Sequence, residues 1–248
     1  MRRRTLGRTA NAGTGVPVGV VTGLWRYPVK SMAAESLASA HLSWAGLAGD
    51  RRWAFLRPAS GTNGFPWHTI RENPSMSIYV PRLLDPGRPD KSAVEVQAPG
   101  GRIYDLADPD FAGQLGGGLR LMRLDRGVFD AMPVSLITTT TVSALCTLAA
   151  VPDSELRFRP NFVITPLSGA AYEEEQWVGC SLRLGDAVVR VDRRDARCIV
   201  VNVDPGTGQP DAPMLKVIGR HRHARAGVYG TTVEPGLVRV GDPVVIVP

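Results

Sequence analysis

The sequence predicts a mostly β fold of the α+β class that contains a β-barrel. Two observations predict it. Short segments rich in β-branched and aromatic residues recur between turn-forming residues, and segments with the capping residues and apolar body of a helix are few. With 248 residues, 44% of them hydrophobic, the chain is long enough for one large or two small domains with a substantial core.

The expected strands run from the N-terminal part of the chain to its end. We place them at residues 18–29, 51–58, 76–84, 93–99, 119–124, 161–166, 181–193, 198–203 and 236–247. Gly185 and Asp186, between two alternating runs, predict a hairpin turn. Gly- and Pro-rich stretches at 58–66, 85–90 and 112–118 are interpreted as surface loops.

Two segments favour helices. Residues 138–151 begin with threonines, which suit an N-cap, and continue with an apolar body, and residues 212–222 predict a second, short helix. A boundary near 127–135 divides the chain into parts 17–130 and 131–248. The basic segment 1–16 is interpreted as a flexible tail.

Charge and cysteine content disfavour several classes of protein. The net charge of +6 comes almost entirely from scattered arginines without interleaved aromatic residues, so nucleic acid is not an expected partner. No apolar run has the length of a membrane span, and the N-terminus lacks the apolar stretch of a signal peptide. Three cysteines at irregular spacing fit no disulfide framework. We therefore expect a cytoplasmic protein without a membrane partner.

Cys198 is the most informative candidate for chemistry. It stands between the charged stretch RRDAR and a β-branched run that begins at Ile199. A lone cysteine is most simply a packing residue, and the alternative is a thiolate that binds or attacks a ligand, which the neighbouring Arg197 favours. His221 and His223 have no third ligand nearby for a zinc site, and the sequence has no CxxC, GxSxG or P-loop motif.

Four other stretches carry groups that suit a phosphate-bearing, polycyclic anion. They supply cationic side chains, an amide, and hydroxyls with free N–H groups at a helix start. The stretches are YPVKS with Lys30 and Ser31, HTIR with Arg71, FRPNF with Arg159 and Asn161, and TTTT at 138–141. Each alone has a structural explanation, as a solvated lysine, an ion-pair partner or a plain helix cap.

Six motifs occur in a characteristic order. They are YPVKS at 27–31, GDRRWAF at 49–55, TIRENP at 69–74, FRPNFVI at 158–164, ARCIVVNVDPGTG at 196–208 and VRVGDPV at 238–244. In this order they resemble the MOSC-domain family, relatives of the C-terminal domain of molybdenum cofactor sulfurase, and most closely its amidoxime-reducing type. The resemblance implies an N-terminal MOSC-type β-barrel domain in 17–130 and a cofactor-binding MOSC domain in 131–248.

The resemblance also implies a function. The family binds a molybdenum–molybdopterin cofactor, and the match makes Cys198 the molybdenum ligand and catalytic residue. The reaction is the two-electron reduction of N-hydroxylated compounds such as amidoximes, hydroxylamines and N-oxides. Pyridoxal phosphate binding is a further expectation. The cofactor-binding positions that we assign are Lys30, Ser31, Arg71, Thr138, Thr141, Arg159, Asn161 and Arg197.

The electrons are expected to come from a separate protein. The sequence shows no flavin fingerprint and no cluster-binding set of cysteines, so we expect a ferredoxin- or flavin-type reductase as partner, of acidic character because the chain is basic. Two other functions stay open. One is a carrier of the cofactor or of sulfur without reductase activity, and the other is a degenerate MOSC fold that binds a different anion.

Overall fold

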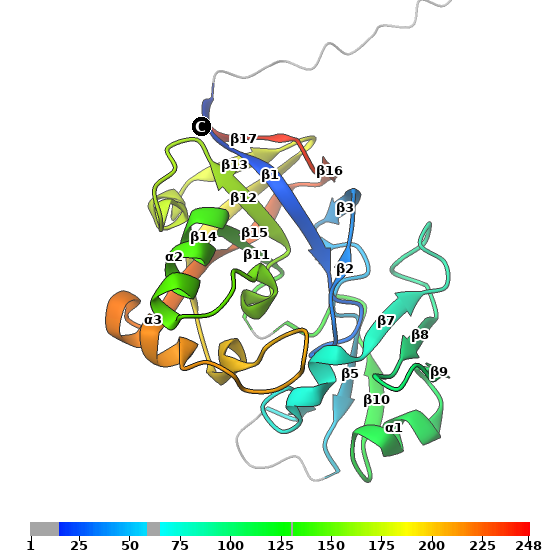
Figure 1. Cartoon of the computed structure of the whole chain (residues 1–248). Coiled ribbons are helices and arrows are strands. Elements are labelled where there is room, and N and C mark those ends of the chain that lie inside the picture. Colours follow the sequence, from blue (N-terminus) through cyan, green and yellow to red (C-terminus); the bar gives the residue numbers. More distant parts are fainter. Residues whose placement is uncertain (1–14, 59–64, 130) are drawn as a thin grey trace, which may run out of the picture.

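The computed structural model describes residues 15–58, 65–129 and 131–248. Residues 1–14 of the expected tail and residues 59–64 of the expected loop at 58–66 lie outside this description. The main feature of the described chain is a closed β-barrel. Two of the helices lie on one side of it, at the left in Figure 1, and the smaller sheets lie on the other side.

Seven of the described strands form the barrel. Their order is β12 (Phe162–Pro166), β11 (Val134–Thr138), β15 (Arg225–Glu234), β14 (Ala187–Ala196), β13 (Ser181–Leu184), β17 (Pro243–Val247) and β1 (Val16–Arg26). The barrel closes because β1 pairs with β12 as well as with β17. β11 and β12 are parallel, and the other neighbouring barrel strands are antiparallel. The predicted barrel is confirmed, and so is the hairpin turn between β13 and β14.

Alternating apolar side chains fill the barrel, as the two-residue period of a strand requires. Val21, Leu136, Phe162 and Val189 are fully buried inside it, and Trp177 covers them with 2% exposure. β1 belongs to the N-terminal part of the chain and is nevertheless a barrel strand. The division of the chain near residue 130 stays a prediction.

The rest of the N-terminal part forms smaller sheets, one of which also contains β16 from the C-terminal part. The first has the order β10 (Arg120–Arg123), β5 (Trp53–Leu56) and β6 (Trp67–His68). The second has the order β16 (Gly236–Arg239), β3 (Ser39–Ser43) and β4 (Gly46–Leu47). The third has the order β7 (Val80–Leu83), β8 (Val94–Gln97) and β9 (Ile103–Asp105). A two-residue strand, β2 (Glu35–Ser36), pairs with the end of β1. The helix α1 (Pro109–Leu115) packs Phe111 against Phe55 and Tyr104, which gives this part its own apolar core.

Two helices cover the outside of the barrel. α2 (Thr139–Ala149) and α3 (Met214–Arg222) confirm the helices expected at 138–151 and 212–222, and they lie side by side in Figure 1. Leu145 of α2 and Ile218 of α3 are buried together with Ile137 and Val163 of the barrel strands. None of the helices in the described ranges has the length and apolar character that crossing a membrane requires.

The strand predicted at 198–203 is wrong. After β14 the chain turns into a 3₁₀ helix, η4 (Ile199–Asn202), in which Ile199 is 51% exposed and Val201 is buried. The β-branched residues pack on neighbouring helices instead of joining a sheet, and Asn202 accepts a hydrogen bond from the backbone N–H of Leu215, 2.8 Å away. The remaining 3₁₀ helices are η1 (Pro74–Ile78), η2 (Glu155–Phe158) and η3 (Glu173–Trp177).

Two other expected segments have different bounds in the structure. The segment expected as a strand at 76–84 begins inside η1, and the loop expected at 112–118 begins inside α1. β11 and β15, which no expected segment covers, are both barrel strands.

Candidate functional site

A cavity of about 1160 Å³ opens at one end of the barrel. The end of β14, the starts of β11 and β15, and the segments before β12 and after β14 form one wall, and segments of the N-terminal part form the other. Seven of the nine predicted site residues line it: Lys30, Ser31, Arg71, Arg159, Asn161, Arg197 and Cys198. Residues that are far apart in the sequence therefore meet at one place, as the motifs predict.

Positive charge dominates the cavity. Its described lining contains nine arginines and one lysine, but only one glutamate and one aspartate. An enclosed surface with this excess of cations attracts anions, and guanidinium groups bind phosphate and carboxylate in forked geometry. The charge of the cavity therefore favours an anionic ligand.

Cys198 is the thiol that faces this cavity. It precedes η4 as its N-cap residue, and its Sγ lies 3.4 Å from Nη2 of Arg71. The Arg71 guanidinium also stacks on Phe65, with 5.0 Å between Cζ and the ring centroid. Cys146 is buried among apolar residues, where burial raises the pKa of its thiol, and Cys180 is not part of the lining. All three cysteines are free, as expected.

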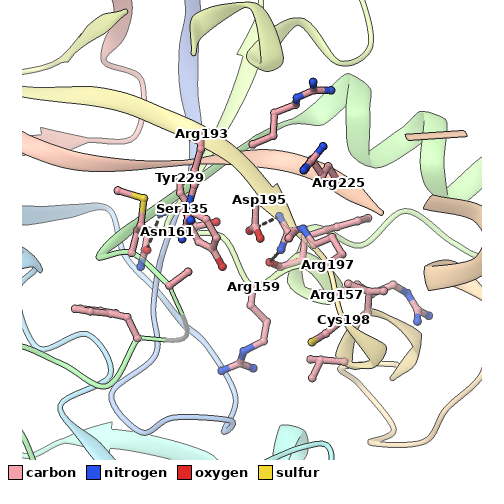
Figure 2. Close-up of a pocket in the computed structure, with 18 of the residues that line it drawn as sticks. Ser135, Arg157, Arg159, Asn161, Arg193, Asp195, Arg197, Cys198, Arg225 and Tyr229 are labelled. Atoms are coloured by element: carbon pink, nitrogen blue, oxygen red, sulfur yellow. Dashed lines mark hydrogen bonds and ion pairs between the residues drawn. The ribbon is translucent and has the colours of Figure 1, made fainter. Parts of the chain in front are cut away.

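Arg197 does not face Cys198, contrary to the expectation that it supports a thiolate there. Its Nε and Nη1 donate hydrogen bonds to the carbonyl oxygens of Ala226 and Phe158, at 2.7 and 2.6 Å, and its Nη2 lies 2.9 Å from Oδ2 of Asp195. These contacts join β14, β15 and the segment before β12, and Figure 2 shows the ion pair between Arg197 and Asp195. The cation beside the Cys198 sulfur is instead Arg71, from the N-terminal part of the chain.

Arg159 is held in the cavity by stacking and by an unusual backbone conformation. Its φ of 51° is left-handed, and its Nη2 donates to the carbonyl oxygen of Met32 at 2.9 Å. Cζ of Arg159 lies 4.2 Å from the ring centroid of Tyr27, and Cζ of Arg51 lies 4.5 Å from the same centroid. Tyr27 is completely buried, which raises the pKa of its phenol to about 12. The neutral ring therefore supports two guanidinium groups of the cavity wall.

Asn161 and Lys30 line the cavity, and both also brace it. Oδ1 of Asn161 accepts a hydrogen bond from the Ser135 backbone at 3.2 Å, and its Nδ2 donates to the carbonyl oxygen of Trp25 at 3.2 Å. Lys30 is 5% exposed, and its Nζ donates to the carbonyl oxygen of Val128 at 3.1 Å. The next residue, Ser31, has a φ of 71° and is also buried.

Thr138 and Thr141 are not brought to the cavity. Thr138 is the N-cap of α2, and both hydroxyls donate to Oε2 of Glu174, at 2.7 and 2.8 Å. All three side chains are fully buried. Burial raises the pKa of the Glu174 carboxyl, and the two hydroxyls partly offset this effect. Glu174 is thus a buried structural carboxyl that fixes the start of α2.

Several cavity residues were missed by sequence reasoning. Arg157 makes a forked ion pair with Asp211, with hydrogen bonds of 2.7 and 2.6 Å that hold the pKa of that carboxyl below its usual range. Arg193 and Arg225 project from β14 and β15 (Figure 2). The arginine-rich stretch before Cys198 was a usable signal, but the pairing of β14 with β15 was needed to place these residues.

The comparisons with known proteins agree with this geometry. The family model described as the MOSC domain matches residues 124–245, and the model described as the MOSC N-terminal beta barrel domain matches residues 18–112. The chain belongs to the MOSC-domain family. The resemblance that the motifs indicate is therefore confirmed.

The proteins to which this MOSC protein is similar include amidoxime-reducing components. Mitochondrial amidoxime-reducing component 1 of Xenopus laevis is 24% identical over 292 aligned residues, which cover 92% of this chain and 82% of that protein. Mitochondrial amidoxime reducing component 2 of Homo sapiens is 30% identical over 128 residues, which cover 46% of this chain and 37% of that protein. The crystal structure of the YUAD protein from Bacillus subtilis covers 92% of this MOSC protein and 95% of its own chain, at 13% identity and a TM-score of 0.52, and shows the same fold.

Proposed function

We propose that this MOSC protein holds a molybdenum–pterin cofactor in the cavity and reduces N-hydroxylated compounds with electrons from a separate electron-transfer protein. The observation that carries the proposal is a thiol at the wall of a strongly cationic cavity, with Arg71 against its sulfur. The 24% identity to an amidoxime-reducing component supports it. The free cysteines are consistent with the cytoplasmic location that we expect.

The residues at the cavity fit such a cofactor. A thiolate is the soft ligand that suits a metal already held by pterin sulfurs, and Cys198 would supply it. The cofactor's phosphate and pterin carbonyl need forked donors and point charges, which Arg71, Arg159 and Lys30 would provide. Among the described residues, His, Cys, Asp and Glu form no group of three that could hold a metal by themselves. No comparison bears on pyridoxal phosphate.

In the reaction the chain itself would bind the cofactor, orient the substrate and exclude water from the cavity. When bound, the cofactor would supply the two electrons that reduce the N–O bond of the substrate. Reduction of an amidoxime breaks its N–O bond, consumes two electrons and two protons, and releases an amidine and water. Arg197 and Tyr27 would fix the segments that carry Cys198 and Arg159, so that the site does not reorganise during turnover.

A comparison of the three cysteines tests the proposal. The parent protein and the Cys198→Ser, Cys146→Ser and Cys180→Ser variants are produced in a host that makes the cofactor, and reduction of benzamidoxime is followed with an artificial one-electron reductant. We expect Cys198→Ser to fold normally and to lose at least about 99% of the activity at matched molybdenum content, because a serine hydroxyl is a hard and largely protonated ligand. The other two variants should stay near the parent rate. Full activity in Cys198→Ser, or equal losses in all three, would contradict the proposal.

The partner proposal has its own test. Steady reduction of benzamidoxime by the isolated protein with NADH or NADPH alone would show that no separate electron-transfer protein is needed. Binding of molybdenum and pterin without any reduction would favour the carrier function instead.

A further inference from the structure

Most of the cations that line the cavity already have partners within the protein. Eight of the ten described lining cations make a hydrogen bond or ion pair: Lys30, Arg51, Arg71, Arg157, Arg159, Arg194, Arg197 and Arg222. These contacts fix the walls of the cavity. Lys30, Arg71 and Arg159 are in addition the residues that the proposed function assigns to the cofactor.

Arg193 and Arg225 are the exceptions. Both are exposed, both line the cavity, and neither guanidinium makes a hydrogen bond or ion pair with any described residue. They lie on the neighbouring strands β14 and β15, where Arg193 pairs in register with Tyr229 and Arg225 pairs with Ala196. An arginine that faces a cavity without a carboxylate partner is available to an oxyanion from outside.

The two arginines lie at a useful distance from Cys198. Arg225 is in register with Ala196, the last residue of β14, and Cys198 follows two residues later, a span of chain of at most about 7 Å. Arg193 is five residues before Cys198, which corresponds to at most about 17 Å. A molecule of drug-like size whose reacting group lies near Cys198 can therefore place a distal group at these guanidiniums, within a cavity of about 1160 Å³.

We infer that Arg193 and Arg225 form a subsite for a carboxylate or phosphate group on the substrate, so that the enzyme prefers acidic N-hydroxylated compounds. This inference rests on the proposed function and narrows its substrate class. The chemistry is a charge-assisted hydrogen bond from a guanidinium to an oxyanion, with the neutral N–OH group left to react near Cys198. Such bonds are worth about tenfold or more in affinity each.

A matched pair of substrates tests the inference. Benzamidoxime is neutral, and 4-carboxybenzamidoxime carries a carboxylate opposite the same reacting group. The cofactor-loaded parent should reduce the acid with at least a tenfold higher kcat/KM. In the Arg193→Gln and Arg225→Gln variants the ratio of the two kcat/KM values should fall about tenfold, and the preference should also weaken with salt. Arg190→Gln is the control, because Arg190 lies on the same strand, is exposed outside the cavity lining and pairs with Asp192.

A binding measurement separates this inference from the proposed function. Calorimetry with 4-carboxybenzamidoxime in the absence of a reductant should show at least about tenfold weaker binding to the Arg193→Gln and Arg225→Gln variants than to the parent and Arg190→Gln. Reduction of both compounds with equal kcat/KM would overturn the inference and leave the proposed function standing. A loss of molybdenum from the two variants would also overturn the inference, because Arg193 and Arg225 would then be cofactor-binding residues and not a substrate subsite. Reduction of neither compound by the loaded parent would contradict the proposed function, and the inference would fall with it.

Discussion

Replacement of Arg197 by methionine should destabilise the protein strongly, although Arg197 lines a cavity. The side chains of Arg197 and Asp195 are 7% and 2% exposed, and they form an ion pair. Arg197 also satisfies two backbone carbonyl oxygens, at 2.7 and 2.6 Å. Removal of one partner from a buried ion pair costs about 3–5 kcal/mol, because the other charge stays buried. The orphaned carbonyls act in the same direction.

The expected result is a decrease of about 4 kcal/mol in the free energy of unfolding of Arg197→Met. It is measured by urea unfolding followed by tryptophan fluorescence. Arg194→Met is the matched control, because Arg194 lies three residues earlier on β14, is 42% exposed and pairs with Glu175 at 3.2 Å. A pair exposed to this extent contributes about 0–1 kcal/mol.

A double variant separates the ion pair from the backbone contacts. Arg197→Met combined with Asp195→Asn also removes the buried negative charge, so it should recover about 2 kcal/mol relative to Arg197→Met alone. Equal stability of Arg197→Met and Arg194→Met would refute the reasoning. So would a double variant that is less stable than Arg197→Met.

Three further predictions concern positions around the cavity. Burial raises the pKa of Glu174. The folded state therefore keeps a proton that the unfolded state releases above its ordinary pKa of 4.5, and stability should fall as pH rises above that value. Glu174→Gln should remove this slope, and an unchanged slope in urea unfolding at several pH values would contradict the assignment. Tyr27→Phe should keep the molybdenum content, because the buried hydroxyl has no hydrogen-bond partner among the described residues. Tyr27→Leu should lower the molybdenum content, because it removes the ring on which the Arg159 guanidinium stacks. Equal molybdenum contents in the two variants would contradict a role for this stacking. Gly227→Ala should destabilise the protein by about 2 kcal/mol, because φ at Gly227 is 72° and an added Cβ would lie 2.7 Å from a backbone oxygen. The control is Gly219→Ala in α3, where an added Cβ meets open space, and this change should be neutral or stabilising by up to about 1 kcal/mol. Thermal melts in which Gly219→Ala is the less stable variant would refute this prediction.

The barrel could be predicted because its strands carry their own signals. β13 and the middle of β14 alternate apolar and polar residues, β17 is a short β-branched run, and the turn at Gly185 fixes where β13 and β14 meet. The helix at α2 followed from its threonine cap and apolar body, whereas the segment of α3 was expected as a short helix without a cap. β15 was missed because glycines interrupt its residues 225–234, and its pairing with β14 is a long-range contact that no local pattern contains.

The strand expected after Cys198 failed for a physical reason. β-branched residues favour a strand only where a neighbouring strand is available for pairing. At Ile199 the chain has already left β14, which ends at Ala196, and it begins the 3₁₀ helix η4. The same residues then pack as a 3₁₀ turn. Local propensity could not show this, because the decision depends on what lies beside the segment.

Motifs placed the site residues at one cavity but could not give the direction of each side chain. Arg197 is adjacent to Cys198 in sequence and yet points to carbonyls on two other segments, while Arg71, 127 residues away, contacts the sulfur. Thr138 and Thr141 have the residue types of an anion site, but a buried carboxyl takes their hydroxyls. Which cation or hydroxyl faces the ligand depends on packing across the whole fold.

The molybdenum and pterin content of the purified protein tests the central claim most directly. The parent and an Arg159→Ala variant are purified from a host that makes the cofactor, and both are checked for folding by circular dichroism. We predict that the parent carries molybdenum and pterin in equal amounts, and that folded Arg159→Ala retains less than about a tenth of either, because a guanidinium held in the cavity contributes a charge-assisted fork. A folded parent without molybdenum, or a folded Arg159→Ala with the parent's content, would contradict the claim that this cationic cavity is a cofactor site.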